Sequence, residues 1–109
     1  MSIAGAVDPS SIDVLVFEIA ECRASGPMRE AAERWCDDRA IRFTTIAVWT
    51  DPAAVIEHRI LIGPTIVVLA EGEEIGRLAG PGSRRRVDRF LGTVGSTVDR
   101  PVPPVLAVA

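Results

Sequence analysis

The chain contains two cysteines, and one of them stands where a thiol can be activated. Cys22 follows the apolar run Val14–Phe17 and precedes a helical pattern that begins near Gly26. A cysteine between a buried strand and a helix start lies near unpaired backbone N–H groups and the positive end of the helix dipole. Both features stabilise a thiolate. We therefore expect the pKa of Cys22 to lie below the ordinary thiol value of about 8.5.

Ser25 stands three residues after Cys22, where a second thiol would complete a redox pair. A thiolate can attack a client disulfide and form a mixed disulfide, but release needs another thiol, which a hydroxyl cannot replace. Cys22 could act with an external thiol such as glutathione, form long-lived mixed disulfides, or carry out no redox chemistry. Ser25 could donate a hydrogen bond to the thiolate, cap the following helix, or do both.

Cys36 is expected to be a core residue. It falls at helical spacing on one apolar stripe with Met28, Ala31, Ala32 and Trp35. A disulfide requires Cα atoms within about 7 Å, and a helix over residues 26–39 separates the two cysteines by more than that. The sequence therefore predicts two free thiols with different surroundings.

Three charged features have a plain interpretation and a functional one. Glu18 is either a solvated carboxylate at a strand end or an acid near Cys22 that takes part in proton transfer. His58 is the only histidine, and no second ligand stands at a useful spacing, so we expect a solvated helix residue and no metal site. The cluster Arg84–Arg86 with Arg89 forms either a solvated face or a grip for a phosphate or an acidic partner.

Composition limits the class of protein. The chain has 109 residues, of which 48% are hydrophobic and 25% charged, with a net charge of -3 and a pI near 5.1. These values are typical of one soluble domain and argue against general nucleic-acid binding, which needs a basic surface. No apolar run approaches the roughly 20 residues of a membrane span, and the first residues lack the pattern of a secretory signal. We expect a cytoplasmic protein.

Hydrophobic periodicity predicts the elements that position these residues. Strands are expected over 12–19, 41–49, 65–70 and 75–79, and helices over 26–39, from Thr50-Asp51-Pro52 onward, and from Ser83 to about residue 94. Residues 1–11 are expected to form an arm or short edge strand, 12–94 the domain, and 95–109 a proline-rich tail that does not continue the helix. Right-handed crossovers make the first two strands parallel.

In this order and at these separations, the sequence resembles the thioredoxin-like fold family over roughly residues 12–92. The marks are Cys22 at the strand-to-helix turn, the helix start Asp51-Pro52, the segment Gly63-Pro64-Thr65 before a buried strand, the turn Glu71-Gly72, and Gly80 after the hairpin. The resemblance implies an α/β fold with a four-to-five-stranded mixed sheet and helices on both faces.

The resemblance also implies a site and an activity. Cys22 and Ser25 would be the catalytic pair of a Cys-x-x-Ser motif, and Arg23 would lie beside them on the client side. The Gly63–Pro64 bond would be cis and face the cysteine. Gly63 would offer backbone groups to an extended peptide by strand addition.

These residues predict thiol–disulfide chemistry through a single cysteine. The expected partners are protein clients with disulfides or an extended segment held along Gly63, Pro64 and Thr65, with glutathione as a candidate external thiol. No cofactor is expected. The alternative is a non-catalytic binding module of the same fold.

The sequence departs from the family pattern around the cysteine. Glu21 replaces the usual tryptophan, and a neighbouring negative charge raises a thiol pKa, which Arg23 would partly offset. Val16 stands where the family has a buried acid, and the chain has no lysine to accompany such an acid.

Overall fold

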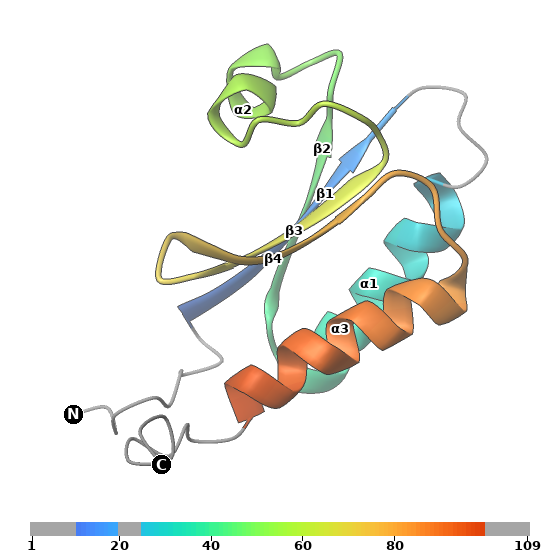
Figure 1. Cartoon of the computed structure of the whole chain (residues 1–109), viewed down its shortest axis with the longest axis vertical. Coiled ribbons are helices and arrows are strands. Elements are labelled where there is room, and N and C mark those ends of the chain that lie inside the picture. The colour runs from blue at the N-terminus through green and yellow to red at the C-terminus, as the bar shows by residue number, and fades with distance from the viewer. Residues whose placement is uncertain (1–10, 20–24, 100–109) are drawn as a thin grey trace, which may run out of the picture.

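A computed structural model of the protein describes residues 11–19 and 25–99 (Figure 1). Its elements, in chain order, are β1 (Ile12–Glu18), α1 (Ser25–Arg39), β2 (Arg42–Ala47), α2 (Pro52–Glu57), β3 (Thr65–Ala70), β4 (Glu73–Ala79) and α3 (Arg84–Asp99). This order agrees with the elements predicted from periodicity. No helix in these ranges combines the length and the apolar character needed to cross a bilayer.

The four described strands form one mixed sheet in the order β2-β1-β3-β4. β1 runs parallel to β2, whereas the pairs β1/β3 and β3/β4 are antiparallel. α1 and α3 lie together on one side of this sheet, and α2 lies at the other side (Figure 1). The expected α/β thioredoxin-like architecture, with a mixed sheet and helices on both faces, is therefore confirmed.

The main core lies between the sheet and the pair α1 and α3. Even-numbered side chains of β1 point into it, so Val14 and Val16 are completely buried. The predicted stripe of α1 packs there together with Cys36, and α3 contributes its apolar stripe at helical spacing, namely Val87, Leu91 and Val94. Burying one such side chain contributes about 1.5–3 kcal/mol to folding.

The opposite face of the sheet carries a smaller apolar layer. Phe17 of β1 and Val67 of β3 point to this side and are fully buried. The imidazole of His58, at the end of α2, lies against Phe17 with ring centroids 5.7 Å apart. His58 is thus the half-buried C-cap of α2 and not the solvated helix residue that was expected.

Local hydrogen bonds explain where the helices begin and end. Asp51 caps α2 by accepting from the Ala54 N–H at 3.1 Å, and Ser83 accepts from the Arg86 N–H at 3.2 Å at the start of α3. Both helices begin at the segments where the sequence placed their starts. The turn between β3 and β4 uses Glu71 and Gly72, both with positive φ, as a tight hairpin turn requires.

The predicted strand boundaries differ from the observed ones by up to two residues, and the predicted end of α3 differs by more. α3 does not end near residue 94 but continues through Gly95 to Asp99. Gly95 is not a terminator, because it is buried against Trp35 of α1: a Cβ at this position would lie 2.7 Å from Trp35 Cζ2. The glycine allows the two helices to approach closely while α3 remains helical.

We predict that Gly95→Ala destabilises the protein and that Gly92→Ala does not. Alanine is favoured over glycine in a helix by about 1 kcal/mol. A Cβ at Gly92 meets nothing within 4 Å, so this control should gain stability. A Cβ at Gly95 must displace the Trp35 ring, which we expect to cost about 1–3 kcal/mol. Urea unfolding measures both changes. Equal stabilisation by the two substitutions would show that Gly95 is not a close-contact position.

Candidate functional site

The junction between β1 and α1 is the centre of the expected site. Cys22 and Arg23 lie outside the described residues, as does Glu21. The structure therefore describes the residues on either side of them, up to Ile19 and from Ser25 onward. β1 ends at Glu18 and α1 begins at Ser25, each one residue earlier than predicted. The segment that carries Cys22 therefore joins the end of a central strand to the start of a fifteen-residue helix.

Ser25 is buried at the start of α1, with 6% of its surface exposed. Its hydroxyl donates to the Ile19 carbonyl at 3.5 Å and so ties the start of α1 to the end of β1. Among the described residues the hydroxyl accepts no bond from an amide of α1, so the cap interpretation gains no support. A hydrogen bond from Ser25 to Cys22 stays a prediction.

Glu18 is neither solvated nor unpaired. Its carboxylate accepts a hydrogen bond from the Arg29 Nε on α1 at 3.2 Å, and its side chain is 24% exposed. The position where the family has its buried acid is filled by Val16, which is fully buried and cannot titrate.

The segment before β3 forms the second wall of the site. The Gly63–Pro64 peptide bond is cis, the state that the resemblance implies. The Pro64 carbonyl accepts from the Gly80 N–H at 2.9 Å, and the Thr65 hydroxyl donates to the Ile62 carbonyl. Pro64 and Thr65 are both fully buried. Thr65 thus holds the loop from within, and its side chain is buried; its contact with a client stays a prediction.

Gly63 is the half-exposed member of this segment, and its position requires glycine. A Cβ there would lie 2.4 Å from Cγ2 of Ile19, the residue that follows β1. Neither its N–H nor its carbonyl forms a hydrogen bond with another residue in the described ranges. Gly63 therefore carries backbone groups that have no partner among residues 11–19 and 25–99, directly beside the strand end that leads to Cys22.

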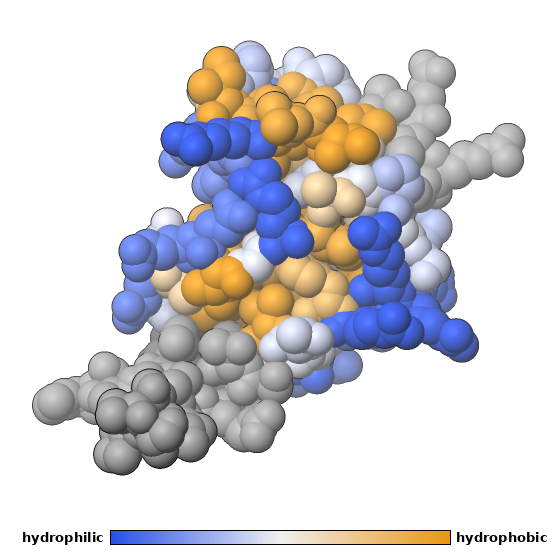
Figure 2. Space-filling view, viewed as in Figure 1, coloured by the Kyte–Doolittle hydropathy of each residue, from blue (hydrophilic) through white to orange (hydrophobic). Residues whose placement is uncertain are grey.

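An apolar surface adjoins Gly63. Leu61 and Ile62 are 94% and 52% exposed, and with Gly63 and Ile19 they line a shallow pocket of about 180 Å³. Trp49 and Ile56, which follow the pocket-lining Val48 and Val55, are 59% and 76% exposed. Figure 2 shows hydrophobic residues gathered at the end of the molecule where α2 lies. We call Trp49, Ile56, Leu61 and Ile62 the apolar surface.

The sequence analysis did not single out this apolar surface. The run Ile60-Leu61-Ile62 stands directly before Gly63-Pro64, and the resemblance draws attention to that pair alone. A signal was present, because the run falls between a helix and a proline, where no strand or helix can bury it. Such a concentration of exposed large apolar side chains is typical of an interaction site.

Cys36 is a free core thiol, as expected. It is completely buried in α1, and burial, assisted by the neighbouring Asp37 carboxylate, raises its pKa to about 12. The neutral thiol is therefore the form present throughout the physiological pH range, so Cys36 is not a nucleophile in the folded protein.

The arginine cluster at the start of α3 is partly used inside the molecule. Arg84 pairs with Glu30 of α1 at 3.0 Å, and Arg86 donates to the Pro81 carbonyl at 3.0 Å. These bonds favour the interpretation of a charged face over a phosphate grip. Within residues 11–19 and 25–99, no group of three or more His, Cys, Asp or Glu side chains could hold a metal ion.

Comparison with known proteins agrees with this architecture. No family model and no curated protein sequence matches the chain. Among solved structures, a thioredoxin mutant from Halobacterium salinarum NRC-1 superimposes with a TM-score of 0.65 at 17% identity, covering 76% of this chain and 74% of its own. A thioredoxin mutant from Entamoeba histolytica superimposes with a TM-score of 0.65 at 20% identity, covering 77% of this chain and 82% of its own. The thioredoxin of Fasciola hepatica superimposes with a TM-score of 0.61 at 18% identity, covering 75% of this chain and 84% of its own. The chain therefore has a thioredoxin-like fold.

Proposed function

We propose that this protein takes part in thiol–disulfide chemistry through Cys22 alone and binds its client as an extended segment along Gly63. The observation that carries the proposal is that the N–H and carbonyl of Gly63, beside the end of β1 and next to the apolar surface, have no hydrogen-bond partner among the described residues. Gly63 touches Ile19, and Cys22 follows Ile19 by three residues, so the extended chain length keeps the Cα atoms of Ile19 and Cys22 within about 11 Å of each other.

Client binding would use two kinds of contact. The N–H and carbonyl of Gly63 would pair with the backbone of the client, as in strand addition. Leu61 and Ile62 would cover an apolar side chain of the client, since they are exposed beside Gly63. The expected clients are protein segments with a disulfide, an extended backbone and apolar flanking residues. Arg23 stays a candidate for a further client contact.

The chemical step is an exchange of one disulfide for another. The Cys22 thiolate attacks one sulfur of the client disulfide, a Cys22–client disulfide forms, and the other client sulfur leaves as a thiolate with the electron pair. Ser25 cannot attack the mixed disulfide in turn. An external thiol such as glutathione would attack the Cys22 sulfur, release the reduced client and leave Cys22 joined to glutathione. A second glutathione thiolate would regenerate Cys22 and produce oxidised glutathione.

The two cysteines should differ strongly in their rates of alkylation. We expect iodoacetamide at neutral pH to alkylate Cys22 at least ~100-fold faster than Cys36, because only Cys22 has an appreciable thiolate fraction there. Cys36 should react only in urea or as the pH approaches its pKa of about 12. Mass spectrometry of peptides after timed labelling measures both rates. Equal, slow labelling of the two thiols in the folded protein would remove the proposed function.

Ser25→Cys should convert the site from a single-thiol to a two-thiol centre. The introduced thiolate would attack the Cys22 sulfur of the mixed disulfide, expel the client thiolate and leave an internal disulfide between Cys22 and the new thiol, which dithiothreitol then reduces. We expect catalysed reduction of insulin by dithiothreitol to rise at least ~10-fold over the natural chain.

Ser83→Cys is the matched control, because Ser83 also stands at a helix start but lies at α3. It adds a thiol that does not stand three residues after Cys22 in the chain, and we expect it to leave the rate of insulin reduction unchanged. An equal rise in both variants would mean that the added thiol acts independently of Cys22.

A further inference from the structure

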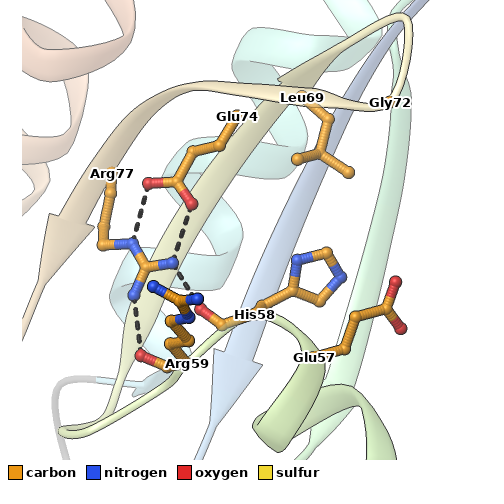
Figure 3. Close-up of a pocket in the computed structure, with 7 residues that line it drawn as sticks. All are labelled: Glu57, His58, Arg59, Leu69, Gly72, Glu74 and Arg77. Carbon is orange, nitrogen blue, oxygen red and sulfur yellow. Dashed lines mark hydrogen bonds and ion pairs between the residues drawn. The ribbon is translucent and has the colours of Figure 1, made fainter.

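Arg77 of β4 holds the start of the loop that carries the apolar surface and Gly63. Its guanidinium donates to the carbonyl of Arg59 at 3.0 Å and to the carbonyl of His58, both just after α2 (Figure 3). The same guanidinium forms a two-point ion pair with Glu74, at 2.9 Å and 2.7 Å. We call these four bonds, with Glu74 and Arg77, the clamp. Its members line a polar hollow of about 360 Å³ beneath the hairpin turn.

A β-bulge makes the clamp possible. Residues three apart normally point to opposite faces of a strand. In β4 the register shifts, so that Gly76 pairs with Val68 but Glu74 pairs with Leu69, and Ile75 is the extra residue. The bulge turns Glu74 to the same face as Arg77. The carboxylate then fixes the plane of the guanidinium, which leaves its remaining N–H groups directed at the loop (Figure 3).

The carbonyls that Arg77 binds belong to the C-cap of α2, His58, and to the residue after it, Arg59. Ile60 N–H bonds to the Val55 carbonyl at 2.9 Å, and Arg59 N–H to the Ile56 carbonyl at 3.1 Å, which together form a Schellman ending. Arg59 adopts a φ of 53°, which is unfavourable for a residue with a side chain. Arg77 binds the carbonyls on each side of this strained position and so sets the direction in which the chain leaves α2.

We propose that Arg77, oriented by Glu74, is a positioning residue for the client loop, residues 58–64. This inference rests on the proposed function for its consequence in client binding. The loop is tied at its far end by the Thr65 hydroxyl and by Gly80, whereas Arg77 supplies the side-chain bonds at its near end. Without the clamp, Leu61, Ile62 and Gly63 lose their fixed orientation relative to Ile19.

The test compares Arg77→Gln with the natural chain in single-turnover exchange. The probe is a synthetic apolar peptide whose one cysteine carries a thionitrobenzoate group. The Cys22 thiolate forms a disulfide with the peptide cysteine and releases the coloured thionitrobenzoate anion. We expect the half-saturating peptide concentration to rise about tenfold in the variant, the factor that corresponds to about 1.4 kcal/mol. The limiting rate should not change, because Arg77 positions the binding loop and not the thiol.

Two controls isolate positioning from general damage. The rate with Ellman's reagent, which reaches Cys22 without using the loop, should stay the same in Arg77→Gln. Arg42→Gln removes another ion pair on the same face of the sheet, to Asp13 at 3.2 Å, and should leave the half-saturating concentration unchanged. If Arg77→Gln does not fold, Glu74→Gln serves in its place, since it removes the orienting charge and keeps the guanidinium.

A second measurement does not depend on Cys22. Hydrogen exchange of the Arg59 and Ile60 amides should become faster in Arg77→Gln, while the Gly80 amide at the far tie keeps its rate. Unchanged exchange at Arg59 and Ile60 would overturn the positioning role. An unchanged half-saturating concentration, or an equal fall in the limiting rate and the Ellman rate, would overturn it as well. A natural chain that does not saturate with the peptide would contradict the proposed function, and hydrogen exchange would still decide the role of Arg77.

Discussion

The burial of β1 on both faces is the constraint on which the rest of the structure depends. Val14 and Val16 fill the core beneath α1 and α3, whereas Phe17 fills the smaller layer beneath His58. Removing apolar surface from water on both sides holds this strand firmly in place. The carboxyl end of β1 determines the position of Ile19. Ile19 in turn marks the point at which the segment with Cys22 leaves the sheet. The expected chemistry is therefore attached to a central, well-packed strand of the sheet.

The candidate site combines that rigid strand end with a loop that is tied at a few defined points. Gly63 fits against Ile19 because it has no side chain. Thr65 and Gly80 bind the loop at its far end, and Arg77 binds it at the end of α2. Between these ties the chain exposes Leu61 and Ile62. Ordered backbone next to exposed apolar side chains is what recognition of an extended segment requires, since a preformed surface loses less entropy on binding.

Most of the fold could be predicted from the sequence, because period and turn chemistry are local properties. The apolar stripe ending at Cys36 predicted α1, the continuous apolar residues of β3 predicted a buried strand, and Glu71-Gly72 predicted a hairpin. The end of α3 was misplaced because it depends on a contact between residues far apart in the chain. Gly95 has the sequence character of a helix terminator, and only its contact with Trp35, a residue sixty positions away, shows why it stands inside the helix.

The sequence by itself determined the type of site: a cysteine between a strand and a helix, a serine three residues later, and a Gly-Pro pair before a buried strand. It also predicted that Cys36 is inert, since that residue belongs to an apolar stripe. Tertiary structure alone decided which groups face outward. It buried Pro64 and Thr65, paired Glu18 with Arg29, left Leu61 exposed, and used a bulge in β4 to bring Glu74 and Arg77 to one face. These outcomes depend on contacts between residues far apart in the chain, and no local pattern of residue types contains them.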